Sequence, residues 1–195
     1  MESPLPQSFV PWYHLVWFFG VIPRQSFILW TAIIKQLSTH DRIWTYTHGP
    51  LACVLCHKAM ETHDHLFFNC SYSRFVCQGL LQRMGIQYMP GMGMKYMPRI
   101  WDQWTEWAAR TSKQLKNPNH IVPRMCLGVA VYNLWKERNA RSFGENDRTK
   151  ESLSTSLCSQ MVAQVHIKWK TDPNVFTFGH VEDYLLVCLC FTLYI

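Results

Sequence analysis

Four residues between positions 53 and 70 have the types and the spacing of a metal-binding site. Thiolate and imidazole groups are ligands that zinc prefers, and a tight Cys-x2-Cys turn lets two thiolates bind the same ion. Because four such ligands complete a tetrahedral shell, no position remains for a catalytic water. The spacing therefore predicts one structural zinc ion, whose binding energy stabilises the fold. The predicted ligands are Cys53, Cys56, His65 and Cys70, spaced Cys-x2-Cys-x8-His-x4-Cys.

Two further histidines lie in the same loop and are alternative ligands, since imidazole is a common zinc partner. His57 directly follows a cysteine ligand and would have to point back across its own turn. His63 lies two residues before His65 and is the second choice for the histidine position. The alternative to a metal site is a set of ordinary buried thiols, which pack as small hydrophobic groups.

The segments on either side of this cluster have the patterns of helices. Residues 23–37 form a nearly continuous apolar segment that begins with Pro23, which the first turn of a helix tolerates. Ser38 and Asp41 have capping-box spacing, which predicts that the next helix starts at Ser38. After the last cysteine, residues 71–84 have helical periodicity, and Gly85 is predicted to end that helix.

The C-terminal half also has helical periodicity. Trp101, Trp104 and Trp107 form an aromatic stripe with Ile100 and Ala108, which is more typical of a core face than of base stacking. We expect Pro123 in the first turn of a long helix that ends near position 144, and another helix along residues 153–169.

The sequence therefore predicts a mainly α fold, in which a small helical domain is organised around a Cys3His zinc knuckle and further helices follow. The predicted division is a zinc-binding domain at 12–85, a Met/Pro/Gly-rich linker at 86–99, a helical extension at 100–171 and an apolar C-terminal tail at 172–195.

Composition and charge bear on whether the chain is folded, what it could bind and where in the cell it lies. Hydrophobic residues make up 48% of the 195 residues, which argues against general disorder. The formal net charge of +6 favours approach to a polyanion, although a charged, solvated surface is the alternative explanation. The N-terminus lacks a secretory leader pattern, so we expect reduced cysteines and an intracellular location in the nucleus or the cytoplasm. The apolar run at 184–195 is too short to span a bilayer as a helix, so no transmembrane segment is predicted. A buried strand, a membrane-touching segment and translated sequence beyond the original reading frame are open alternatives for this run.

Three stretches of the chain resemble a known family. ETHDHLFFNCSYSRFV, preceded by PRQSFILWTAIIKQLSTHDRIW and the cysteine knuckle, resembles the zinc-binding domain that follows reverse transcriptase in plant LINE-type (non-LTR) retrotransposons. WKERNARSF, at 135–143, is similar to a later motif of that family. The four predicted zinc ligands match the family's ligand pattern. Where the family usually has a tryptophan, this chain has Cys77, which we interpret as a decayed core position rather than a spare ligand because four ligands already complete the shell.

The resemblance implies a function without catalysis. The chain has no GxxxxGK[ST], HExxH or GxSxG motif, and it lacks the paired aspartates of a polymerase. The family's setting implies RNA or DNA as a partner, together with the reverse transcriptase domain of the parent element. Lys136, Arg138 and Arg141 are the predicted phosphate contacts, although cations near a helix C-terminus also favour its dipole. The alternatives are a zinc-stabilised protein-interaction or structural module and a degenerate retroelement fragment without function.

Overall fold

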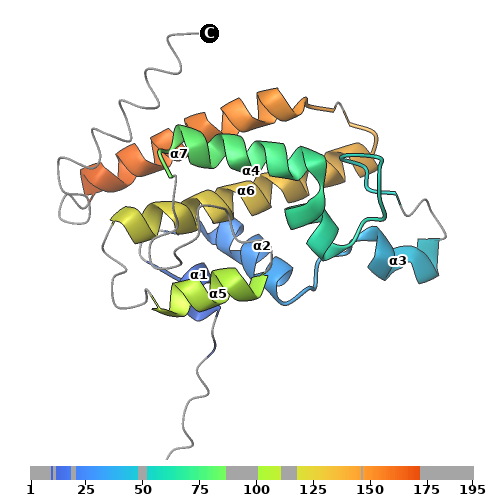
Figure 1. Cartoon of the computed structure of the whole chain (residues 1–195), viewed down its shortest axis with the longest axis horizontal. Helices are drawn as coiled ribbons and strands as arrows, with labels where there is room; N and C mark the ends of the chain where they lie inside the picture. The colour runs from blue at the N-terminus through green and yellow to red at the C-terminus, as the bar shows by residue number, and fades with distance from the viewer. Residues whose placement is uncertain are drawn as a thin grey trace, which may run out of the picture.

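The computed structural model is a helical protein (Figure 1). It describes residues 10, 12–18, 21–47, 52–86, 101–110, 118–145 and 147–171. No strand occurs among these residues, and their one β-bridge pairs Ala52 with Met60. The mainly α fold class is thus confirmed. The helices are α1 (Tyr13–Val16), α2 (Pro23–Ile33), α3 (His40–Thr47), the π-helix η1 (His65–Asn69), α4 (Ser71–Arg83), α5 (Trp101–Arg110), α6 (Pro118–Ser142) and α7 (Lys150–Thr171).

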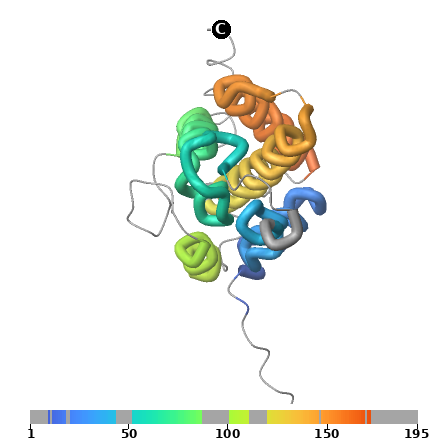
Figure 2. Tube along the Cα trace, turned by 90° about the vertical axis from the view of Figure 1, so that its right-hand side faces the viewer, coloured from blue at the N-terminus to red at the C-terminus, as the bar shows by residue number. Residues whose placement is uncertain are grey.

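Helix α6 is the central element of the fold. It packs against α2 and α7, and also contacts α4 and α1, while α4 and α7 pack against each other. Figure 2, which views the molecule from one side, shows α6 between the α4–α7 pair and the N-terminal helices. The buried residues from all of these helices form one hydrophobic cluster. The division into domains stays a prediction, and most of its linker and all of its tail lie outside the described residues.

The aromatic stripe of α5 faces this core, as its helical spacing predicts. Trp101, Trp104 and Trp107 are each at most 4% exposed. The rings of Trp104 and Trp107 meet edge to face at 5.8 Å between centroids, and Phe68 of η1 meets Trp101 in the same way at 4.9 Å. These geometries are favourable for aromatic pairs. The tryptophans of α5 are therefore packing residues, as expected.

Two predicted helix starts are wrong. Helix α3 begins at His40, and the hydroxyl of Thr39, not Ser38, lies 2.6 Å from the carboxylate of Asp41. Helix α6 begins at Pro118, so Pro123 lies inside the helix rather than in its first turn. Pro118 itself occupies the first position, where the missing N–H costs nothing. Tertiary packing of the buried helix α6, rather than its local sequence, keeps the helix continuous at Pro123.

Backbone geometry confirms the predicted ends of α4 and α6, whereas α2 ends at Ile33 and not near residue 37. Gly85 follows α4 with φ +67° and Gly144 follows α6 with φ +75°, the left-handed conformation that glycine adopts readily at a helix C-terminus. Of the two neighbouring apolar residues Phe75 and Val76 on α4, Val76 is buried and Phe75 is 40% exposed.

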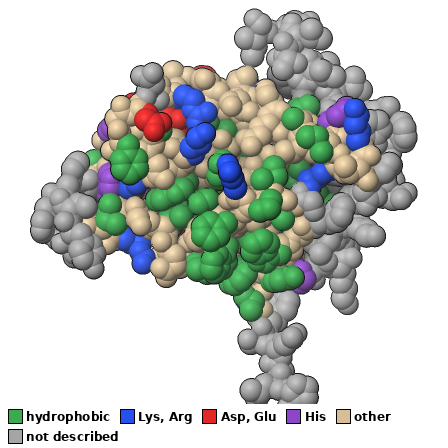
Figure 3. Space-filling view, turned by 180° about the vertical axis from the view of Figure 1, so that it is seen from behind, with side chains coloured by type: hydrophobic (Ala, Val, Ile, Leu, Met, Phe, Trp, Pro, Cys, Tyr) green, Lys and Arg blue, Asp and Glu red, His purple; other side chains and the backbone are tan. Residues whose placement is uncertain are grey.

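Helices α1 and α2 carry aromatic side chains at the surface. Tyr13 and Phe27 are more than half exposed, and Trp17 is 39% exposed. Trp30 links part of this group, because its ring lies 5.9 Å from that of Phe27 and 6.3 Å from that of Trp12. Figure 3 shows a gathering of hydrophobic side chains on one face of the molecule. Exposed apolar patches of this kind mark interaction surfaces more often than chance.

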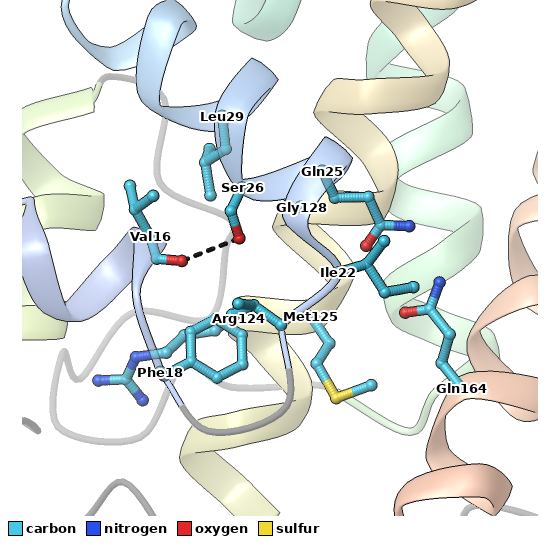
Figure 4. A pocket seen from close by; sticks show the side chains of 11 residues that line it. Val16, Phe18, Ile22, Gln25, Ser26, Leu29, Arg124, Met125, Gly128 and Gln164 are labelled. Carbon is cyan, nitrogen blue, oxygen red and sulfur yellow. Dashed lines mark hydrogen bonds between the residues drawn. The ribbon is translucent and has the colours of Figure 1, made fainter.

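A small pocket lies where α1, α2, α6 and α7 meet (Figure 4). Ser26 of α2 donates a hydrogen bond to the carbonyl of Val16 at 3.1 Å and thereby ties α2 to the end of α1. Arg124 and Gln164 reach this pocket from α6 and α7. Among the described residues, no helix is long and apolar enough to cross a membrane.

Candidate metal centre

The four predicted ligand residues lie together in the fold. One donor atom from each falls within 4.8 Å of all the others. The sulfurs of Cys53 and Cys70 are 3.9 Å apart, and the sulfur of Cys56 is 3.3 Å from Nε2 of His65. A tetrahedral zinc with bonds of about 2.3 Å to sulfur separates its sulfur ligands by about 3.8 Å. The donor set and its spacing therefore fit one zinc ion without rearrangement of the backbone.

The first two ligands lie on a turn that the backbone closes on itself. The N–H of His57 donates to the carbonyl of Cys53 at 2.8 Å, and the N–H of Cys53 donates to the carbonyl of Ala59 at 2.8 Å. His57 has φ +54°, so the chain reverses directly after Cys56. The backbone amides of Leu55 and Cys56 lie close enough to the sulfur of Cys53 to favour its thiolate form. Such amide donors stabilise the thiolate form that binds a metal.

The third and fourth ligands lie at the two ends of a wide helical turn. The N–H of Cys70 donates to the carbonyl of His65 at 2.6 Å, five residues back, which is the π-helical pattern. Thr62 begins this turn, because its hydroxyl accepts the N–H of His65 at 3.0 Å. Single π turns are rare and occur often at functional sites. The turn brings two ligands that are five residues apart onto the same side. The sequence pattern does not predict a π-helix here, and the five-residue spacing of the ligands is its visible signal.

Cys70 also forms the start of α4. It is the N-cap residue, and the amides of Tyr72 and Ser73 in the first turn of that helix lie close enough to lower the pKa of its thiol. The hydrogen bond from the Cys53 thiol is the main cause that lowers the pKa of Cys70 to about 5, and the helix amides add to it. The same hydrogen bond, together with burial, raises the pKa of Cys53. A metal ion would replace the proton that these two sulfurs share.

The alternative ligands lie outside the cluster. His57 is exposed on the outer side of its turn. His63 is 5% exposed, and its Nδ1 lies 3.1 Å from the hydroxyl of Thr39, while burial lowers the pKa of its imidazole. Cys77 is 2% exposed and lines an apolar pocket with residues of α5 and α6. It is a core position, as its interpretation predicts, and burial raises the pKa of its thiol to about 12.

The three predicted phosphate contacts have different surroundings. Lys136 is exposed on α6. Arg138 is 4% exposed, and its guanidinium donates to the carboxylate of Glu61 at 2.7 and 2.9 Å. Arg141 donates to Glu137 and to backbone carbonyls of the cysteine turn. The structure thus gives both arginines internal partners, and phosphate contact stays a prediction.

Two carboxylates that accept hydrogen bonds from these arginines were not predicted from the sequence. Glu61 is fully buried beside the cluster, and Glu137 is 1% exposed on α6. A single glutamate in a polar loop and another in a charged helix carry no sequence signal of burial. Only the positions of their partners, 77 residues later for Glu61 and four for Glu137, reveal their role.

The fold and the site together define a class of protein: a helical protein with a partly buried Cys3His cluster of the type that holds structural zinc. Residues 5–76 match the model of a family described as zinc-binding in reverse transcriptase, and this segment contains all four ligands. The family resemblance is therefore confirmed for this part of the chain, whereas an origin in plant LINE elements stays a prediction. No curated protein and no solved structure gives a significant match.

Proposed function

We propose that the chain is a zinc-stabilised accessory domain that binds or positions nucleic acid for a reverse transcriptase and has no catalysis of its own. The observation that carries this proposal is the Cys3His cluster within the segment that matches the family. Three sulfurs and one nitrogen supply a complete zinc shell, so zinc would act through folding and not through a bound water. A folded surface close to the reverse transcriptase would be its contribution to the reaction.

Positive side chains near the cluster support nucleic acid as the ligand. Lys58 follows the cysteine turn and Arg74 lies on the first turns of α4, and both are exposed. Phe75 is also exposed, and the ammonium group of Lys150 lies 4.6 Å from the centre of its ring. Cations bind phosphate while aromatic faces stack on unpaired bases. We propose this surface, together with Lys136 on α6, as the site of contact, inside the cell and with RNA or DNA.

Binding of a single-stranded oligonucleotide should therefore depend steeply on salt. We expect log affinity to fall linearly with log salt, with a slope of about −0.7 for each phosphate that the protein neutralises. Lys58→Ala and Arg74→Ala should each weaken binding and make that slope shallower by about one contact. Fluorescence anisotropy of the zinc-loaded chain with labelled RNA and DNA of the same sequence measures both quantities.

Arg110→Ala is the matched control, because Arg110 is an exposed cation on α5 whose partner is Glu106. It should change the slope less than the two test variants do. Equal slopes for all three variants would exclude the surface around Lys58 and Arg74, and the absence of binding at low salt would exclude nucleic acid as the ligand.

The exposed aromatic residues of α1 and α2 favour a second candidate function, a protein-interaction module. Tyr13, Trp17 and Phe27 expose apolar area that folding of the described residues does not cover. Docking through such rings would be insensitive to salt. Phe27→Ser should then abolish binding to a protein partner and leave the oligonucleotide affinity unchanged.

A further inference from the structure

The last turns of α6 contact the metal cluster from outside. The guanidinium of Arg141 donates to the carbonyl oxygens of Val54 and Leu55, at 3.3 and 3.4 Å. These are the two residues between Cys53 and Cys56. Arg141 therefore reaches across 86 and 87 positions of the chain to bind the cysteine turn itself.

The two carbonyls belong to the peptide groups whose N–H ends face a ligand. The carbonyl of Val54 shares a peptide plane with the N–H of Leu55, and the carbonyl of Leu55 shares one with the N–H of Cys56. Those two amides lie beside the sulfur of Cys53. Hydrogen bonds in such chains polarise one another, so a cation on the carbonyl side strengthens the amide donors on the other. Arg141 thus orients and polarises the amides that hold a zinc-binding thiolate.

Arg141 also contacts the turn that carries the fourth ligand. Its guanidinium lies 4.7 Å from the centre of the ring of Tyr72, which follows Cys70 by two residues in the first turn of α4. Both Arg141 and the Tyr72 hydroxyl donate to the carbonyl of Arg148, at 2.7 and 3.0 Å. One guanidinium therefore spans the two backbone turns that hold Cys53 and Cys70.

A buried carboxylate fixes the orientation of this guanidinium. Glu137 accepts Nε of Arg141 at 3.0 Å and also accepts the backbone N–H and the side chain of Arg148, at 2.9 and 2.8 Å. Burial alone would raise the pKa of the Glu137 carboxyl, but the hydrogen bonds from Arg148 and Arg141 lower it. Glu137 is therefore ionised at neutral pH and holds the fork of Arg141 towards the cysteine turn.

Arg138 acts on the other half of the cluster through Glu61. One oxygen of the fully buried Glu61 carboxylate accepts Nε and Nη2 of Arg138, and it also accepts the N–H of His40 at 3.0 Å. The next residue, Thr62, accepts the N–H of His65 on its hydroxyl. The ion pair therefore fixes the backbone directly before the turn that presents His65.

From these contacts we infer that Glu137, Arg138 and Arg141 of α6 are positioning residues of the metal centre. Arg141 orients the amides of the cysteine turn, Glu137 orients Arg141, and Arg138 fixes the loop that places His65 through Glu61. Zinc binding at residues 53–70 and docking of α6 are consequently coupled, although the two segments are far apart in the chain. This inference rests on the zinc site of the proposed function and is independent of nucleic-acid binding.

Zinc affinity of the full chain, measured by competition with a chromophoric chelator, tests the inference. Arg141→Ala should weaken zinc binding by about 10–100-fold, the usual effect of removing a group that orients a metal ligand. Arg141→Lys keeps the positive charge but loses the planar, forked guanidinium, so its zinc affinity should lie between those of Arg141→Ala and wild type. Glu61→Gln, which tests the other half, should also weaken binding. Arg110→Ala removes an exposed arginine of α5 and should leave the affinity unchanged.

Substitution of cobalt for zinc gives an absorption spectrum that reports the geometry of the ligands, which a loss of stability alone would not change. The cobalt–thiolate absorption bands of Arg141→Ala and Glu61→Gln should differ from those of wild type, whereas Arg110→Ala should retain them. If Arg141→Ala and Glu61→Gln fold and keep the zinc affinity and the cobalt–thiolate bands of wild type, the inference is overturned. If Arg141→Ala does not fold, the same two measurements on Glu61→Gln decide. A wild-type chain that folds without taking up zinc would overturn both the inference and the zinc site.

Discussion

Replacement of Cys70 by serine should abolish tight zinc binding and unfold the region around the cluster. Structural zinc binds with a free energy on the order of 10 kcal/mol, which is comparable to the whole stability of an ordinary domain. Cys70 is the N-cap residue of α4 and serine is favoured at that position, so the substitution does not weaken the start of the helix and removes chiefly the thiolate. Circular dichroism and zinc content, measured together with and without a chelator, follow both effects. Chelation of the wild-type chain should reproduce the loss of helical signal.

Cys77→Ala is the matched control for this result. Cys77 lies on the same helix and is 2% exposed, but its sulfur is outside the cluster of four donors. We expect full zinc content and a modest loss of stability from the small cavity. If Cys77→Ala lost zinc while Cys70→Ser kept it, the ligand assignment would be wrong.

Replacement of Arg124 by methionine should destabilise the fold by about 3–5 kcal/mol, since each hydrogen bond from a charged donor contributes about 1.5–3 kcal/mol and relief of the buried charge offsets part of the loss. Arg124 is completely buried in α6 and donates to the carbonyls of His14, Ala108 and His120, at 3.0, 3.1 and 2.7 Å. Its guanidinium also lies 4.5 Å from the centre of the Trp107 ring. It therefore joins α6 to both α1 and α5.

Burial lowers the pKa of Arg124 to about 10, so the group is charged at neutral pH. Urea unfolding of the zinc-loaded chain measures the effect of its replacement. Arg110→Met is the control, because that arginine is exposed and its ion pair with Glu106 should contribute at most about 1 kcal/mol. Equal stability of Arg124→Met and wild type would show that the three carbonyls are satisfied in another way.

The metal ligands and the helix periodicity were accessible from sequence because both depend on local spacing. The Cys-x2-Cys turn and the buried tryptophans of α5 needed no knowledge of distant partners. The roles of Arg138 and Arg141 did depend on such partners. Their position in a basic helix end predicted phosphate contacts, whereas Glu61 and the cysteine turn, far earlier in the chain, give them internal hydrogen bonds.

The predicted starts of α3 and α6 were wrong for a related reason. The N–H of His40 at the start of α3 pairs with the carboxylate of Glu61, so the partner that caps this helix lies 21 residues away and not in the local capping box. Pro123 is tolerated inside α6 because tertiary packing of that central helix outweighs the lost hydrogen bond. Local rules identify such elements but do not fix their ends where a buried partner competes.

Zinc K-edge X-ray absorption of the purified full chain shows directly whether three cysteines and one histidine hold a structural zinc ion. We expect one zinc per chain, with three sulfur ligands at about 2.3 Å and one nitrogen ligand at about 2.0–2.1 Å. A folded chain that contains no zinc, or one whose zinc is surrounded by oxygen ligands, would contradict this expectation.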